Sequence, residues 1–238
     1  MKKRIWELDA FRGLCILGMV AVHLVFDLVV LYRVIPVTLP PLFNFVQLWG
    51  GVLFLVISGI SVTLGRRNLR RGLVVLGAGA AVSAVTVAMH LMGLADRSII
   101  IYFGVLQCLG TCMLLWSLLK KLPSPLLITA AAVMIAAGLY LMRTVLVDHP
   151  WLIWLGFLYP GFSTADFFPL LPHLGFFLLG AVLGRLLYPK KQSLFPKVDP
   201  GNGLIRFLSA CGRLSLPIYM LHQPVINGLV WLFAVMTH

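Results

Sequence analysis

The feature that most constrains this chain is a series of apolar runs without charge, each long enough to cross a bilayer as a helix. Such runs predict membrane-spanning helices, because a helix satisfies its own backbone hydrogen bonds within lipid. The composition agrees, since 61% of the residues are hydrophobic and only 11% are charged. The expected spans lie at residues 10–32, 42–64, 72–94, 98–119, 123–142, 167–187 and 214–236. The sequence therefore predicts an all-α, polytopic transmembrane helical bundle with about seven spans.

Residues 144–165 are apolar but do not fit this pattern, because Pro150 and Pro160 interrupt them and they are rich in Trp and Tyr. Aromatic rings of this kind favour the headgroup region of a bilayer. We expect an interfacial or re-entrant segment here, with an eighth span as the alternative. The longest stretch between spans, residues 189–203, is too short to fold alone, so residues 1–238 are expected to form a single domain.

The Lys and Arg residues are distributed unequally between the two sides of this topology. If the N-terminus is inside, only Arg33, Arg97 and Arg143 fall outside. The sixteen others are Lys2, Lys3, Arg4, Arg12, Arg66, Arg67, Arg70, Arg71, Lys120, Lys121, Arg185, Lys190, Lys191, Lys197, Arg206 and Arg213. This bias predicts an N-in, C-out orientation and accounts for most of the net charge of +12. Nucleic-acid binding is not expected, because no soluble basic domain is present to carry it.

The first span carries Asp9, Arg12, His23 and Asp27. Because successive helical residues turn by about 100°, these side chains share one stripe, which should face a protein interior or a water-filled cavity rather than lipid. Arg12 lies at the cytoplasmic edge, and His23 lies about 16 Å deeper. A substrate with phosphates in the cytoplasm and a reactive end in the membrane would fit this layout.

A histidine as deep as His23 is a candidate catalytic base, and Asp27 one turn away could orient it and support its protonated form. The alternative is a buried, purely structural hydrogen-bonded pair. Two interpretations of Arg12 also stay open, a phosphate-binding role and simple extension toward the inner headgroups.

Two further polar clusters lie later in the chain. Asp166 and His173 are expected at the outer entrance of the sixth span, where Asp166 could instead be an acid favoured by the helix dipole. His222 and Gln223 lie between two prolines near the middle of the last span, and interrupted helices of this kind line cavities. The alternative for His222 is an interhelical hydrogen bond. No cysteine or histidine spacing suggests a metal site, so no metal is expected.

Several segments together resemble one known family. They are RIWELDAFRGLCILGMVAVHLVFDL (4–28), FLVISGIS (54–61), YFGVLQCLG (102–110), DFFPLLPHLGFFLLG (166–180) and LPIYMLHQPV (216–225). They are similar to the bacterial branch of the heparan-α-glucosaminide N-acetyltransferase catalytic-domain family. The spacing of Arg12 and His23 also resembles the signature of the acyltransferase-three family, another group of transmembrane acyl transferases.

The resemblance implies transfer of an acetyl or acyl group from cytoplasmic acetyl-CoA to a sugar on the far side of a bacterial cytoplasmic membrane. It assigns Arg12, with Asp9 beside it, to cofactor binding, His23 to deprotonation of the acceptor and Asp27 to orienting His23. The residues assigned to substrate binding are Asp166, His173, His222 and Gln223. The expected partners are acyl-CoA, a glycan or amino-sugar acceptor and the lipid bilayer, and glycine-rich helix faces allow a homo-oligomer without requiring one.

The chain departs from the lysosomal members of that family. Their catalytic histidine is thought to lie in the loop after the first span, whereas residues 31–41 of this chain contain no histidine. The role of His23 therefore rests on the acyltransferase-three spacing and on burial, and a cell-envelope sugar is favoured over heparan as acceptor. A proton-coupled small-molecule transporter that uses the His23–Asp27 pair as a relay is the main alternative, and a structural subunit is the other.

Overall fold

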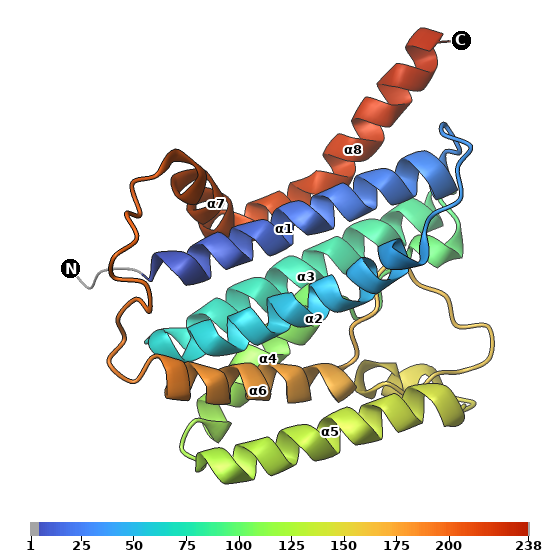
Figure 1. Cartoon of the computed structure of the whole chain (residues 1–238). Helices are drawn as coiled ribbons and strands as arrows, with labels where there is room; N and C mark the ends of the chain where they lie inside the picture. Colours follow the sequence, from blue (N-terminus) through green and yellow to red (C-terminus); the bar gives the residue numbers. More distant parts are fainter. Residues whose placement is uncertain (1–4, 238) are drawn as a thin grey trace. The chain divides into compact units, whose positions relative to one another are not determined.

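The computed structural model describes residues 5–237. They form helices joined by loops, and their β-structure is limited to isolated β-bridges. The α-helices are α1 (Trp6–Phe26), α2 (Pro41–Leu64), α3 (Asn68–Leu91), α4 (Val105–Leu119), α5 (Ser124–Thr144), α6 (Leu170–Leu187), α7 (Gly203–Arg213) and α8 (Ser215–Thr237) (Figure 1). Three short elements accompany them: the π-helix η1 (Asp27–Leu31) and the 3-10 helices η2 (Arg97–Ile99) and η3 (Pro150–Leu155). The predicted all-α, multi-pass class is confirmed.

Within residues 5–237, five helical stretches are long and apolar enough to cross a membrane: Trp6–Leu31, α2, α3, α5 and α6. A sixth is reached if α7 and α8, which meet at a bend of 82°, are counted as one broken span. Helix α4 has only 15 residues and is shorter than the predicted span 98–119. Of the roughly seven predicted spans, helix length and composition therefore support five or six, and α4 is shorter than predicted.

The fourth predicted span is shortened by polar contacts that hydropathy cannot detect. Helix α4 begins after Gly104, whose backbone N–H donates to the side chain of Gln107 at 3.1 Å. The N–H of Val105, the next residue, donates to Asp166 at 2.9 Å. Residues 100–103 are not helical, and Phe103 forms an isolated bridge with Phe167. The side chains of Gln107 and Asp166 therefore fix the start of α4 well inside the apolar run.

Residues 145–169 contain no helix of spanning length; the helix η3, with six residues, is the longest there. This agrees with the expectation that residues 144–165 do not form an eighth span. Of the residues used for the charge bias, Lys2, Lys3 and Arg4 lie outside the described part of the chain.

The chain divides into two compact units. The first unit contains residues 1–54 and 190–238, and the second unit contains residues 55–189. The first unit includes α1, η1, the start of α2, α7 and α8, so it combines helices from the N-terminal and C-terminal parts of the sequence.

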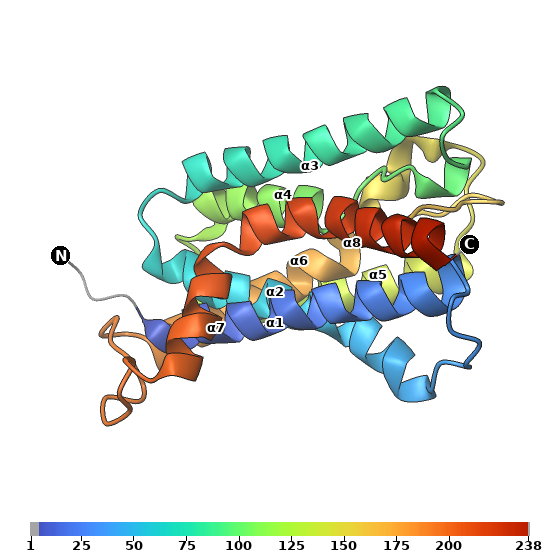
Figure 2. The ribbon, with the colours of Figure 1, turned by 90° about the horizontal axis from the view of Figure 1, so that it is seen from above.

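Helix α7 packs against the N-terminal half of α1 through backbone surfaces (Figure 2). Gly13 faces the carbonyl oxygen of Leu208, and Gly212 faces the carbonyl oxygen of Asp9, so closely that a Cβ at either glycine would collide with that oxygen. Glu7, which is 2% exposed, accepts hydrogen bonds from the Ser193 hydroxyl and the following backbone N–H. The loop before α7 is thereby tied to the start of α1.

In the second unit, α3 packs against α4 and α5 packs against α6. The Gln107 side chain donates to the carbonyl oxygen of Gly79 at 2.9 Å and to the Ser83 hydroxyl at 2.7 Å. At the other end of α4, the Arg185 guanidinium donates to the carbonyl oxygens of Lys120 and Leu122 at 2.7 and 2.8 Å. Both ends of the short helix α4 are therefore held by polar side chains.

Candidate functional site

His23 lies in the last turn of α1 and is half-buried. Its Nδ1 lies 2.9 Å from the carbonyl oxygen of Met19. Because a carbonyl oxygen can only accept, Nδ1 carries the proton of this hydrogen bond. In the neutral ring the lone pair is then on Nε2, so His23 is held in the tautomer that a general base at Nε2 requires.

His222, on α8, contacts His23 edge to face with the ring centroids 4.9 Å apart. Its Nδ1 also donates to a backbone carbonyl, that of Tyr219, so its lone pair is on Nε2 as well. That Nε2 is buried and has no hydrogen-bond partner within the described chain. The structure thus brings together two residues 199 positions apart in sequence, both with the same ring nitrogen left to accept.

Asp27 is 2% exposed and begins the π-helix η1, a type of helical irregularity that is frequent at functional sites. Gln223 donates a side-chain hydrogen bond to its carboxylate, and His23 interacts with it electrostatically. The second carboxylate oxygen, Oδ2, is buried and has no partner among residues 5–237. The ring of His23 is therefore oriented by Met19, and Asp27 acts on it through charge.

A chain of hydrogen bonds runs from Asp27 toward the end of the first span. The side-chain oxygen of Gln223 accepts from the Asn227 amide at 2.9 Å, and Asn227 in turn accepts from the Tyr32 hydroxyl. The Asn227 amide also donates to the backbone carbonyl of Gln223 at 2.9 Å. These bonds fix which way each amide points, so that the nitrogen of Gln223 faces Asp27.

The first unit therefore contains two buried acceptor atoms without donors, Oδ2 of Asp27 and Nε2 of His222, beside a histidine with a fixed tautomer. Leaving a buried acceptor unpaired costs about 1–3 kcal/mol, so such atoms in a native structure call for an explanation. A bound molecule with N–H or O–H groups would pair them. The cluster of His23, Asp27, His222 and Gln223, called the histidine site below, can thus bind a donor-bearing group and take a proton from it.

The residues expected at the cytoplasmic end of α1 form an ion pair. The Arg12 guanidinium lies 3.3 Å from the Asp9 carboxylate, one helical turn away. The two side chains are 21% and 14% exposed. The structure therefore keeps a charged group of each sign on the same face of α1, about three to four turns before His23.

Asp166 and His173 belong to the second unit, and each has a local partner. Asp166 accepts the backbone N–H of Val105 at the first turn of α4, where a negative charge complements the helix dipole. Nδ1 of His173 donates to the carbonyl oxygen of Pro169 at 2.7 Å, and its ring lies against Phe168 with the centroids 4.8 Å apart. These contacts hold both residues within the second unit.

We expect replacement of Asp166 by alanine to destabilise the second unit by about 1 kcal/mol, because α4 loses the acceptor for its first N–H and a favourable charge at its N-terminus. Thermal unfolding in detergent would measure this change. Replacement of the exposed Asp148 by alanine removes the same charge without a helix end and should leave the unfolding temperature unchanged. Equal unfolding temperatures of the two variants would contradict the proposed role of Asp166 at the start of α4.

His23, Asp27, His222 and Gln223 were predicted from the sequence, whereas Asn227 and Tyr32, which the structure joins to them, were not. The spacing of Gln223 and Asn227, four apart on one helix, is a signal that could have found Asn227. No local pattern could have found Tyr32, because it lies 195 positions from its partner. Within residues 5–237 no group of three or more His, Cys, Asp or Glu side chains is arranged to hold a metal ion.

Comparison with known protein families agrees with this architecture. Residues 4–224 match the family model described as heparan-alpha-glucosaminide N-acetyltransferase, catalytic. The match covers α1 to the middle of α8 and so includes every residue of the histidine site. No curated protein and no solved structure matches the chain significantly. Because the match extends over nearly the whole sequence, the chain belongs to the heparan-α-glucosaminide N-acetyltransferase catalytic family.

Proposed function

We propose that this membrane protein transfers an acetyl group from acetyl-CoA to an amino or hydroxyl group of a sugar, with His23 as the general base. The observation that supports this most directly is the pairing of the Nδ1-anchored His23 with the unpartnered acceptors of His222 and Asp27. The family is one of acetyltransferases that use acetyl-CoA as donor. The proposal treats residues 1–238 as one catalytic domain.

The proposed step begins with the acceptor amine or hydroxyl hydrogen-bonded to Nε2 of His23. As the acceptor atom attacks the carbonyl carbon of the thioester, Nε2 takes its proton, and the bond between the acetyl carbon and sulfur breaks. The protonated ring then gives its proton to the departing thiolate, so that CoA leaves as a free thiol. The negative charge of Asp27 stabilises the imidazolium between these two transfers. The alternative route, in which the histidine first carries the acetyl group itself, uses the same residues.

His222 and Gln223 are proposed to position the acceptor. Nε2 of His222 can accept a hydrogen bond from a second hydroxyl of the sugar, and Gln223 keeps Asp27 in place. Asp166 and His173, which lie in the second unit, stay candidate substrate-binding residues on the basis of the sequence alone. A cell-envelope sugar is the proposed class of acceptor.

The proposed location is the bacterial cytoplasmic membrane, with the N-terminus inside and the C-terminus outside. The excess of Lys and Arg on the inner side supports this orientation. The orientation requires α4, about 22 Å long at 1.5 Å per residue, to cross the bilayer as a short helix. Arg185, which binds the carbonyl oxygens at the end of α4, supports an inner location for that end, because cationic side chains favour the inner surface.

A thiol-release assay tests the proposal. The full chain, reconstituted in nanodiscs, is given acetyl-CoA with a panel of amino sugars and hydroxyl-bearing sugars, and free CoA thiol is measured. We expect thiol release that depends on an acceptor, together with a mass increase of one acetyl group on that acceptor. No acetyl-CoA binding and no thiol release with any acceptor, together with substrate uptake into vesicles, would instead support the proton-coupled transporter.

Asn227 provides a second test, because its side chain donates a hydrogen bond to the side-chain oxygen of Gln223. Replacement of Asn227 by alanine removes the hydrogen bonds to Gln223 and from Tyr32, so Gln223 no longer holds Asp27 in one orientation. We expect kcat to fall about tenfold, the equivalent of one lost hydrogen bond to a buried group, while KM for acetyl-CoA stays unchanged. Replacement of the neighbouring Gly228 by alanine, where an added Cβ meets nothing within 4 Å, is the matched control. An equal loss in both variants, or a change in KM alone, would contradict the positioning role.

A further inference from the structure

We propose that a cleft between α7 and the start of α1 binds the phosphorylated nucleotide head of acetyl-CoA. This inference rests on the proposed function and adds a site to it that lies outside the histidine site. The cleft is open to solvent, has a volume of about 510 Å³ and is formed entirely by residues of the first unit. Volumes of this size are typical of sites for small ligands and cofactors.

The charges in the cleft favour an anion. Arg206 and Arg213 line it, and both side chains are exposed. Within residues 5–237 neither guanidinium has a hydrogen bond or an ion pair. The one carboxylate of the cleft, Asp9, is paired with Arg12 at 3.3 Å, so its charge is already balanced. Two guanidinium groups are therefore available to a ligand, and guanidinium binds phosphate with two parallel hydrogen bonds.

The spacing of these two arginines suits a ligand with separate phosphate groups. Seven residues apart on α7, Arg206 and Arg213 share one face of the helix and lie about 10 Å apart along its axis. Coenzyme A carries a diphosphate and a separate phosphate on its ribose. A phospholipid with one phosphodiester would occupy only one of the two positions.

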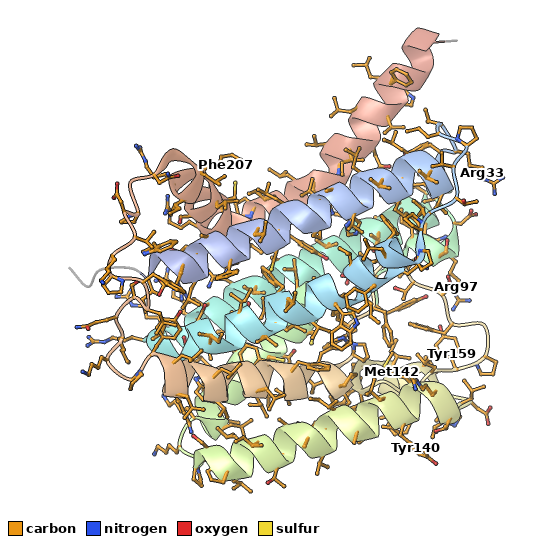
Figure 3. All side chains as sticks on the ribbon, viewed as in Figure 1. Arg33, Arg97, Tyr140, Met142, Tyr159 and Phe207 are labelled. Atoms are coloured by element: carbon orange, nitrogen blue, oxygen red, sulfur yellow. The ribbon has the colours of Figure 1, made fainter. Side chains whose placement is uncertain are left out.

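Aromatic side chains provide a surface for a flat base. Trp6 and Phe207 both line the cleft, and Phe207 on α7 is 56% exposed (Figure 3). Stacking on an aromatic ring contributes about 1–3 kcal/mol per base in nucleic-acid complexes and works with any base. The same combination of aromatic rings and guanidinium groups suits the adenine of coenzyme A.

The walls of the cleft are held in place independently of any ligand. Gly212 brings α7 into backbone contact with α1 at Asp9, next to the cleft. Glu7 anchors Ser193 and Leu194, which lead into the loop that ends at α7. The cleft is therefore a feature of packed secondary structure.

The cleft and the histidine site share helix α1. Asp9 and His23 are 14 residues apart, or about 21 Å along the helix. The pantetheine arm of coenzyme A is a long, thin chain with the thioester at its end. An acetyl-CoA molecule whose head lies in the cleft can therefore extend its arm along α1 toward His23.

The test measures binding of acetyl-CoA and of acetyl-pantetheine, which lacks the nucleotide head, to the full chain in nanodiscs of neutral lipid. In the double variant Arg206→Ala, Arg213→Ala we expect acetyl-CoA to bind about 10- to 100-fold more weakly, the range for hydrogen bonds to charged groups. Acetyl-pantetheine should bind as it does to the unchanged protein. Ala210→Leu keeps both arginines but fills the cleft, and it should also weaken acetyl-CoA binding selectively.

The double variant Lys190→Ala, Lys191→Ala is the matched control, because it removes the same charge from the exposed loop of the same unit. Acetyl-CoA binding that is unchanged in both cleft variants would overturn the proposal. The proposal would also be overturned if the cleft variants bound acetyl-CoA normally but no longer responded to added phosphatidylglycerol. That result would make the cleft a lipid site. If the unchanged protein bound neither acetyl-CoA nor acetyl-pantetheine, the proposed function itself would fail.

Discussion

Replacing His23 by alanine is expected to lower kcat for acetyl transfer by about 10²- to 10⁴-fold, the usual contribution of a positioned general base. The reason is the fixed tautomer, in which Met19 holds the proton on Nδ1 and leaves Nε2 to accept one from the sugar. The thiol-release assay at saturating acetyl-CoA measures this change. Added imidazole should restore part of the rate, because it can enter the space that the ring vacates and serve as base.

His90 provides the matched control for that experiment. It lies in the last turn of α3, and its Nδ1 also contacts a backbone carbonyl, that of Ala95, at 3.2 Å. His90→Ala should therefore transfer acetyl groups at the rate of the unchanged protein. A His23→Ala protein with the unchanged rate would eliminate the mechanism, and a loss without imidazole rescue but with a lowered unfolding temperature would assign His23 a structural role.

Replacing Gly13 by alanine is expected to destabilise the first unit by about 2 kcal/mol or more, although it adds a single methyl group. The added Cβ would collide with the carbonyl oxygen of Leu208, and a backbone atom cannot move aside as the end of a side chain can. Helix α7 must therefore shift away from α1, which also distorts the cleft. Thermal unfolding and acetyl-CoA binding should both report the change.

Gly18 lies on the same helix, but a Cβ there would meet nothing within 4 Å. Gly18→Ala should be neutral or stabilising by up to about 1 kcal/mol, because alanine favours the helix more than glycine does. The two substitutions are chemically identical and should act in opposite directions. A destabilisation that is equal at both positions would show that α7 does not pack closely on α1.

The polar stripe of the first span is an example of what sequence could predict. Helical periodicity alone placed His23 and Asp27 on one face, and an ionisable group within an apolar span is costly unless it is paired. The same reasoning selected His222 and Gln223, because prolines interrupt the last span. The contact of the two histidine rings agrees with that reasoning.

The start of α4 and the partner of Gly13 are examples of what sequence could not predict. Hydropathy treats residues 98–119 as one run, whereas hydrogen bonds from Gly104 and Val105 decide where the helix begins. Periodicity likewise gives the face on which Gly13 lies, but not which helix approaches it. Both features depend on contacts between residues far apart in the sequence, which a local pattern does not contain.

The hydrogen bond from Tyr32 to Asn227 also has a consequence for biosynthesis. It joins residues 195 positions apart, so the partner of Tyr32 is made much later than Tyr32 itself. At about 5–20 residues per second, a ribosome needs about 10–40 s to cover that distance. During this time the first helix is already in the membrane, and the contacts of His23 and Asp27 with α8 have not yet formed. A newly made chain therefore has an interval in which these polar groups depend on water, lipid headgroups or an insertion factor.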